Sequence, residues 1–512
     1  MSNVRILRFQ LRLYARALLV GIVAFCGARA LGNVPGGIVS GTTAAVTITN
    51  GSNGPTLSNG IVQIVCNTNG GSLSQINYTY NNGSGTVTKQ MLLNGKDGGE
   101  FYWEYGGFGG ATWTYSVVVD PATNGGAYAE VAFTSVATGA SADGDLQINF
   151  SMLRGSPGFY TTLTMSHHSG DIACGLGEMR TNIYLAPDFN WMSVSPTVQR
   201  ELGINANFVP AYDSTQEDSL CVSGVNAGTY DDKYKFSQLW GTQRVWGWGS
   251  VNDPANGVTS GQNVGIWYVL ASSEYYNGGP LKPELMDAPM VNMLNGGHYY
   301  MGVDSSWGAN ETWTRVQGPF FVYCNNVSNT LKDPVQTSQA LYADAVAQGQ
   351  AEATAWPYSW YNNATYDSAY AQASRRGTVT GTITINDPGN PSASGSNLWV
   401  GVVQQPSTTD NCYDFQEWYK PYQFWVKTDG SGNFSIPSVI SGSNYTLYAF
   451  GQGAPGTFMS QTQTGGNPPW SYNLPATPFS VTVTGGATTS LGTLTWTPTR
   501  VGPTRSVVGP CT

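Results

Sequence analysis

The feature that most constrains the fold is a series of short runs of β-branched and aromatic residues, separated by turns rich in Gly and Asn. Residues 45–166 contain AVTITNG, IVQIVCN, TWTYSVVVD, YAEVAFTSV, LQINFSML and FYTTLTMS, and NVGIWYVLAS and GPFFVYCN follow later. Such alternation is typical of β-strands. The chain has 64 Gly, 16 Trp and 29 Tyr but only 10% charged residues, a composition that favours an extracellular β-protein with many turns. We therefore predict an all-β protein.

One segment departs from this rhythm. Residues 337–357, TSQALYADAVAQGQAEATAWP, predict a helix that Pro357 stops. A second series of strands then opens at RRGTVTGTITIND and has the size and rhythm of an immunoglobulin-like sandwich. The expected organisation is a large β-sandwich over residues 31–355, a linker over 356–375, a small sandwich over 376–498 and an unassigned tail over 499–512.

The first 30 residues predict export. Four arginines precede the apolar stretch ALLVGIVAFCGA, which is too short to span a bilayer, and ARA at 28–30 has the form of a cleavage site. The mature chain is expected to be secreted and extracellular, with the periplasm as the alternative. No later run is apolar enough for a membrane helix.

Cysteines and charge limit the other possibilities. Six cysteines follow the leader without the spacing of a zinc or redox motif, so we expect sparse structural disulfides among Cys66, Cys174, Cys221, Cys324, Cys412 and Cys511. A formal net charge of −9 argues against nucleic acid and anionic membranes as partners. Exposed Trp and Tyr side chains would suit sugars, whose CH faces stack on aromatic rings.

The stretch TYDDKYKFS at 230–238 gathers charges in a chain that has few of them. Alternating charges usually form a solvated face, which is the simpler interpretation of Asp231, Asp232, Lys233 and Lys235. The alternative is that Lys233 has a chemical role. In a regular strand, Asp231 would share a face with Lys233 while Asp232 would point away.

Three histidines are the candidates for acid or base chemistry. His167 and His168 are adjacent, so on a strand they point to opposite faces and would be surface or hydrogen-bonded residues. His298 differs because it follows two glycines, which allow close backbone approach to a ligand, and precedes Tyr299 and Tyr300.

Arg180, in GLGEMRTNIYL, has two interpretations. It either pairs with Glu178 or another acid, or forms a bidentate clamp on a substrate carboxylate.

Five stretches carry a resemblance to a known family: GLGEMR, YDDKYKFSQLWGTQRVWGW, SSEYYNGGPLKPEL, NMLNGGHYY and QGPFFVY. In their order and approximate spacing the chain resembles the rhamnogalacturonan lyases of polysaccharide lyase family 4. The resemblance implies a mutarotase-like super-sandwich followed by a fibronectin-III-like domain. It also implies a secreted endolyase that cleaves rhamnogalacturonan I of the plant cell wall by β-elimination. A third, jelly-roll domain of the family is expected to be absent, since the chain stops where that domain would begin.

The resemblance also assigns residues. The catalytic Lys and His of the family match Lys233 and His298. The family places two arginines, spaced Arg-x-x-x-Arg, on the substrate carboxylates; the first matches Arg180 and the second falls on Tyr184. Two tyrosines of some members fall on Val291 and Met293 and are not carried over. We expect Arg180, Tyr184, Asp231 and Tyr299 to bind substrate.

β-Elimination requires removal of the uronate C5 proton and departure of the O4-linked rhamnose. An amine is a useful base only when neutral, so Lys233 would need a pKa well below the usual value of about 10.4. We expect Lys233 as base and His298 as acid, with the reverse assignment open. Asp231 would position or tune Lys233, and Asp232 would be structural. Arg180 would neutralise the carboxylate, and no acidic cluster accompanies the pair, so we expect no metal or other cofactor.

Two other classes of function remain open, and a monomer is expected in each case. A glycoside hydrolase needs two carboxylates, but no spacing singles out a pair among Glu178, Glu274, Glu284 and Asp287. A non-catalytic pectin-binding protein, or a decayed lyase, would bind the polymer without shortening it. The missing second arginine raises this alternative.

Overall fold

The structure is a computed structural model of the 512-residue chain. It describes residues 44–93, 101–106, 108–110, 112–138, 143–177, 179–196, 198–201, 208–210, 219–221, 230–231, 244–256, 258–275, 279–280, 290–295, 306–328, 331–405, 415, 420–452, 454–461 and 473–499. Among these residues, no helix combines the length and apolarity that a bilayer crossing needs.

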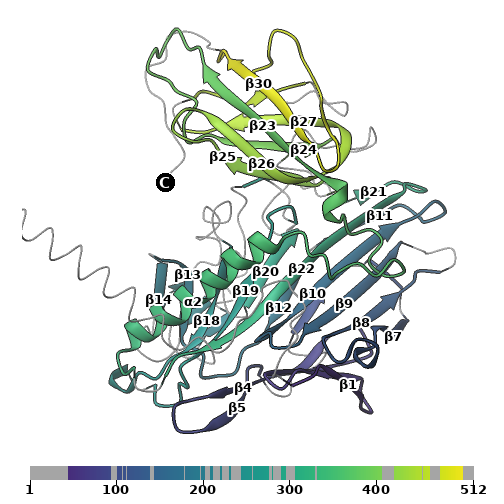
Figure 1. The fold of residues 1–512 in the computed structure, drawn as a ribbon, viewed down its shortest axis with the longest axis vertical. Coiled ribbons are helices and arrows are strands. Elements are labelled where there is room, and N and C mark those ends of the chain that lie inside the picture. Colours follow the sequence, from purple (N-terminus) through teal and green to yellow (C-terminus); the bar gives the residue numbers. More distant parts are fainter. Residues whose placement is uncertain are drawn as a thin grey trace, which may run out of the picture. The chain divides into compact units, whose positions relative to one another are not determined.

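One eight-stranded sheet forms the first layer of the large sandwich (Figure 1). Its order is β1-β2-β3-β4-β6-β12-β20, and β5 pairs with β4. The bounds are β1 Thr47–Asn50, β2 Pro55–Ser58, β3 Val62–Cys66, β4 Leu73–Asn81, β5 Thr86–Gln90, β6 Phe101–Glu104, β12 Met179–Ile183 and β20 Met290–Asn295. All these pairings are antiparallel.

A nine-stranded antiparallel sheet forms the second layer, in the order β14-β13-β18-β19-β22-β10-β9-β8-β7. The bounds are β7 Trp113–Val119, β8 Tyr128–Ser135, β9 Asp145–Leu153, β10 Gly158–His167, β13 Trp191–Ser195, β14 Val198–Glu201, β18 Val245–Ser250, β19 Val264–Val269 and β22 Trp313–Asn326. Each of the eight runs named in the sequence analysis overlaps one of these strands or one of the first sheet.

The two sheets pack face to face through one large apolar core. On β6, the ring of Phe101 lies 6.0 Å from that of Phe150 on β9 and 5.9 Å from that of Phe159 on β10. Trp103 donates its indole N–H to the Thr161 hydroxyl on β10 at 2.9 Å. Since strand residues alternate between faces, the side chains next to Phe101 and Trp103 on β6 point away from this core.

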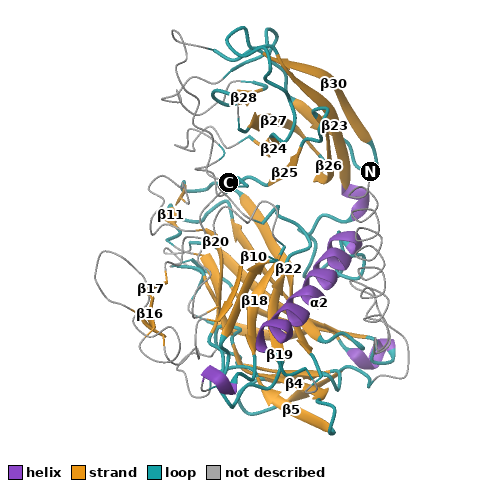
Figure 2. Ribbon diagram, turned by 90° about the vertical axis from the view of Figure 1, so that its left-hand side faces the viewer, coloured by secondary structure: helices purple, strands orange, loops and turns teal. Residues whose placement is uncertain are grey.

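Helix α2, Pro334–Ala355, covers part of the outer face of the nine-stranded sheet. It lies across β18, β19 and β22 in both views (Figure 1, Figure 2). The Asp333 carboxylate caps its first turn by accepting from the Gln336 N–H at 2.8 Å. Tyr342 on its buried face donates to the carbonyls of Val194 and Val245 at 3.0 and 3.1 Å.

Short elements complete this region. A two-stranded sheet pairs β11, Cys174–Gly175, with β21, Ser306–Trp307. A three-stranded sheet has the order β15-β16-β17, with bounds Phe208–Pro210, Ser219–Cys221 and Tyr230–Asp231. Within the described part of the chain, 3₁₀ turns span Pro121–Asn124, Pro254–Asn256 and Ala373–Arg375.

The second sandwich has its own core and two sheets. One sheet has the order β26-β23-β30, in which β23 and β30 are parallel; the other has the order β25-β24-β27-β28, with β29 paired to β27. The bounds are β23 Arg376–Ile385, β24 Trp399–Gln404, β25 Gln423–Lys427, β26 Asn433–Ile440, β27 Gly442–Phe450, β28 Phe458–Met459, β29 Val481–Val483 and β30 Thr488–Trp496. The all-β class, with a large sandwich followed by a small one, is confirmed.

The prediction of structural disulfides is wrong for three cysteines. Cys66, Cys174 and Cys324 are free thiols. Cys66 and Cys324 are fully buried in the apolar core, where a thiol packs as a small hydrophobic group, and burial raises the pKa of both. Burial also raises the pKa of Cys174, to about 11. The side chains of the other three mature-chain cysteines lie outside the described residues.

Candidate functional site

The outward face of β6 and β12 carries a polar patch around Arg180. Its members are Tyr102, Glu104, Arg180, Asn182 and Tyr184, and we call it the β6–β12 patch. The strand register pairs Arg180 with Glu104 and Asn182 with Tyr102, so alternation brings these side chains to one face. The intervening residues on both strands are buried in the core.

Arg180 forms an ion pair at the centre of this patch. Its Nε–H donates to Oε2 of Glu104 at 2.5 Å, and the two side chains are 21% and 33% exposed. Asn182 donates from Nδ2 to the same carboxylate oxygen at 3.3 Å. Arg180 thus pairs with an acid, Glu104, and its role as a clamp on a substrate carboxylate stays a prediction. Glu178, the partner named from the sequence, lies outside the described residues.

Tyr184 stands where the resemblance to the lyase family leads us to expect a second arginine. Its ring stacks on that of Tyr102, with centroids 6.2 Å apart and planes inclined by 17°. Burial raises the pKa of the Tyr102 hydroxyl above its usual value, and a hydrogen bond with Tyr184 adds to the shift. The structure thus brings Arg180 and Tyr184 together with two residues of β6 that the sequence analysis missed.

Strand β20 is the other neighbour of β12, and it leads toward the predicted catalytic histidine. The register pairs Met293 with Arg180 and Val291 with Asn182. By the resemblance described above, these are the two positions at which some members of the family carry tyrosine. β20 ends at Asn295, and His298 follows three positions later, outside the described residues.

The remaining predicted site residues stay untested. Asp231 ends β17, where the register pairs it with Ser219 in a sheet separate from the β6–β12 patch. Lys233 and Tyr299 lie outside the described residues, as does His298. Among the residues that the structure describes, no cluster of three or more His, Cys, Asp or Glu side chains is placed to hold a metal ion. The absence of a metal from the reaction remains a prediction.

His167 and His168 are hydrogen-bonded residues, as expected. The ring of His167 is buried, with Nδ1 2.5 Å from the Glu311 carbonyl oxygen and Nε2 2.8 Å from that of Ile172. His168, which is half-exposed, has Nε2 3.1 Å from Oδ2 of Asp145. Neither belongs to the β6–β12 patch.

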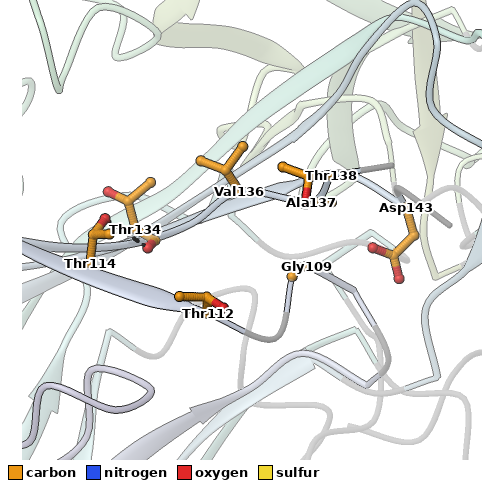
Figure 3. A pocket seen from close by; sticks show the side chains of 9 residues that line it. Gly109, Thr112, Thr114, Thr134, Val136, Ala137, Thr138 and Asp143 are labelled. Carbon is orange, nitrogen blue, oxygen red and sulfur yellow. Dashed lines mark hydrogen bonds between the residues drawn. The ribbon is translucent and has the colours of Figure 1, made fainter. Parts of the chain in front are cut away.

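A separate depression lies on β7 and β8 (Figure 3). It is lined by glycines, by apolar Val136 and Ala137, and by the hydroxyls of Thr112, Thr114, Thr134 and Thr138, with Asp143 at one end. Burial raises the pKa of the Asp143 carboxyl above its ordinary value. None of the residues named from the sequence as catalytic or substrate-binding lines this depression, so we place the candidate site at the β6–β12 patch instead.

Known proteins resemble this chain in both of its sandwiches. Residues 375–465 match the family described as "Polysaccharide lyase family 4, domain II". The rhamnogalacturonate lyase of Dickeya dadantii is 28% identical over 229 residues, which cover 44% of this chain and 32% of that protein. A probable rhamnogalacturonate lyase C of Emericella nidulans is 28% identical over 312 residues, covering 57% and 26% of the respective chains.

The matched region spans about a third of the length of the Dickeya relative. Among solved structures, a galactose mutarotase-like protein from Clostridium acetobutylicum gives a TM-score of 0.30 at 13% identity, covering 55% of this chain and 99% of that chain. A similarity this low does not establish a fold, so the fold described above follows from the sheet topology. The domain match and the aligned lyases show that this chain is similar to proteins of polysaccharide lyase family 4.

Proposed function

We propose that the chain is a rhamnogalacturonan lyase that cleaves the bond between galacturonic acid and rhamnose by β-elimination. The names of the aligned relatives support the substrate class. The observation that carries the proposal is the position of Arg180 on an outward polar patch, beside the strand that leads to His298.

Arg180 would bind the carboxylate of the galacturonate residue at the cleavage point. Removal of the C5 proton moves negative charge onto that carboxylate, so a fixed cation beside it stabilises the enolate-like intermediate. The neutral Tyr184 would supply a ring and a hydroxyl where relatives place a second cation. Sugar CH groups pack on aromatic rings, so the Tyr102–Tyr184 stack suits a neighbouring sugar of the polymer.

Lys233 would accept the C5 proton, and His298 would donate a proton to the leaving glycosidic oxygen, O4 of the galacturonate, which departs bound to rhamnose. The C4–O bond breaks, its electron pair leaves with the oxygen, and the electrons of the C5–H bond form the C4–C5 double bond. Lys233 must be neutral to act as base, because an ammonium group has no lone pair for the proton. The reverse assignment, with His298 as base and Lys233 as acid, gives the same products.

A hydrolase is the weaker candidate because of where Glu274 lies. This carboxylate was one of four considered for a hydrolytic pair, but it is 3% exposed and forms a bidentate ion pair with Arg376. A glycosidase acid must reach the glycosidic oxygen, so Glu274 is ruled out for that role. The other three carboxylates lie outside the described residues.

Export through residues 1–30, endo cleavage, independence of metals and a monomeric state complete the proposal. The composition, poor in charge and rich in Gly and Tyr, supports an extracellular protein.

Mass spectrometry of the products tests the reaction type. An elimination product carries a C4–C5 double bond and is one water lighter than the hydrolysis product of the same length. We expect rhamnogalacturonan to yield oligosaccharides with this lighter, unsaturated galacturonate at the non-reducing end. Saturated ends would show hydrolysis instead, and unchanged polymer that stays bound would show a binding protein.

A further inference from the structure

We propose that Glu104 is a positioning residue for the reaction, acting through Arg180. This inference rests on the proposed function, because it assigns Arg180 to the substrate carboxylate. No contact of Glu104 itself with substrate is required.

The geometry of the pair supports positioning. Glu104 stands directly opposite Arg180 in the β6–β12 register and accepts from Nε–H at 2.5 Å. Nε is the guanidinium nitrogen nearest the backbone, so a carboxylate bound there fixes the plane of the group. The two terminal nitrogens of an arginine carry the donors that form a fork to a second carboxylate. Glu104 would therefore set the direction in which that fork faces.

Glu104 is itself held in place. Asn182, on the same strand as Arg180, donates to the same Oε2 at 3.3 Å. Tyr102, two residues before Glu104, stacks on Tyr184. A carboxylate that is hydrogen-bonded from the neighbouring strand has little freedom to move, so it can fix the orientation of a long side chain.

The exposure of the pair indicates that its role is not mainly one of stability. Both side chains are partly open to water, at 21% and 33%, and such ion pairs contribute little to folding. Variants at Glu104 are therefore expected to fold, so a change in their kcat/KM reports on catalysis and not on loss of folded protein.

A different role for Glu104 would change KM in the opposite direction. If Glu104 merely competed with the substrate for Arg180, its removal would strengthen binding and lower KM. If Glu104 positions Arg180, its removal weakens catalysis, and an uncharged acceptor of the same size restores part of the loss.

The test is a double-mutant cycle on purified full-length protein with rhamnogalacturonan as substrate, comparing Glu104→Ala, Arg180→Lys and the double variant with wild type. We expect Glu104→Ala to lower kcat/KM about tenfold, the effect of one net hydrogen bond. In the Arg180→Lys background the same change should have an effect of less than about twofold, because lysine has no guanidinium fork for Glu104 to orient. Glu104→Gln, whose amide oxygen accepts the same bond, should recover at least about threefold over Glu104→Ala.

Asp188→Asn is the matched control. Asp188 pairs with Lys89 at 2.7 Å in the same sandwich, and both partners are more buried than Glu104 and Arg180. This variant should have a lower melting temperature than the wild type and an unchanged kcat/KM. Effects of Glu104→Ala and Arg180→Lys that multiply, an unchanged kcat/KM in Glu104→Ala, or a lowered KM would each overturn the proposal.

Binding separates this inference from the proposed function. The same four proteins are titrated calorimetrically with rhamnogalacturonan oligosaccharides. If the wild type binds without releasing unsaturated products, the proposed function fails, while non-additive losses of affinity still support Glu104 as a positioning residue and additive losses overturn it. A wild type that neither binds nor cleaves overturns both.

Discussion

Arg376 and Glu274 form a bidentate ion pair that joins the first strand of the small sandwich to the large one. Nη1 lies 2.7 Å from Oε2 and Nη2 2.9 Å from Oε1, and both side chains are 3% exposed. The guanidinium also donates to the carbonyls of Ala371 and Ser438, so the charged groups are hydrogen-bonded as well as paired.

Removing one partner of this pair should destabilise the protein strongly. Glu274→Ala leaves a buried guanidinium without its counter-charge, and we expect the free energy of unfolding to fall by about 3–5 kcal/mol in urea titrations. His168→Ala, which breaks the half-exposed contact with Asp145, is the control and should cost less than about 1 kcal/mol. Equal losses in the two variants would contradict a special role for the buried pair.

Buried carboxyl groups should make stability depend on pH. Burial raises the pKa of Glu352 to about 7 and that of Asp367 to about 6. Glu352 on α2 accepts from the hydroxyls of Tyr160 and Tyr358 and from the amide of Gln348. The folded state therefore holds protons that the unfolded chain releases near its lower, ordinary pKa values.

This difference fixes the sign of the pH effect. The stabilisation is fully present below the unfolded pKa values, near pH 4, and is lost as pH rises through the folded values of about 6 and 7. In denaturation series between about pH 4 and about pH 8, the free energy of unfolding should fall with pH, by up to about 1.4 kcal/mol per unit for each group. Glu352→Gln, which cannot titrate, should show a shallower fall; parallel curves would contradict the assignment.

Arg180→Lys should remove most of the activity. A lysine ammonium can still meet Glu104, but as a point charge it cannot replace a bidentate fork on a carboxylate. We expect kcat to fall about a hundredfold, as when one donor to a developing anion is lost. Arg375→Lys is the matched control, since Arg375 is exposed and lies outside the patch. Near-normal kinetics for Arg180→Lys would assign carboxylate neutralisation to another group, and Tyr184→Phe would then be the variant to measure.

The catalytic pair can be tested against a neighbouring lysine. Lys233→Ala and His298→Ala should each lower kcat at least about a hundredfold, the lower end of general acid–base catalysis. Lys235 lies two residues after Lys233, and Lys235→Ala is the internal control: this variant should keep the wild-type kcat. If Lys233→Ala and Lys235→Ala behaved alike, the stretch around them would be a solvated charge run.

Much of the fold was predictable because it depends on local pattern. The expected helix at 337–357 is observed as Pro334–Ala355. Its end precedes Pro357, which disfavours a helical conformation for the residue before it. The helix begins three residues before the predicted start, because its apolar pattern begins only after the N-terminal cap. Asp333 followed by Pro334 is the sequence signal that marks the true start.

The site was less predictable because it depends on pairing between distant strands. Glu104 and Arg180 are 76 positions apart and meet only through the register of β6 and β12. The run FYWE alternates in the way expected of a strand, but no local signal states which strand it joins or which of its residues faces Arg180. The family resemblance predicted Arg180 and Tyr184 as site residues, whereas only the structure shows that Glu104 and Tyr102 lie beside them.

The most direct test of the central claim follows the ultraviolet absorbance of the products. Purified protein is incubated with rhamnogalacturonan, and absorbance of the conjugated C4–C5 double bond is recorded beside the release of reducing ends. We expect the two signals to rise together, one double bond for each chain cut, in the presence of a chelator as well as in its absence. Reducing ends without that absorbance would mean hydrolysis and would contradict β-elimination by this protein.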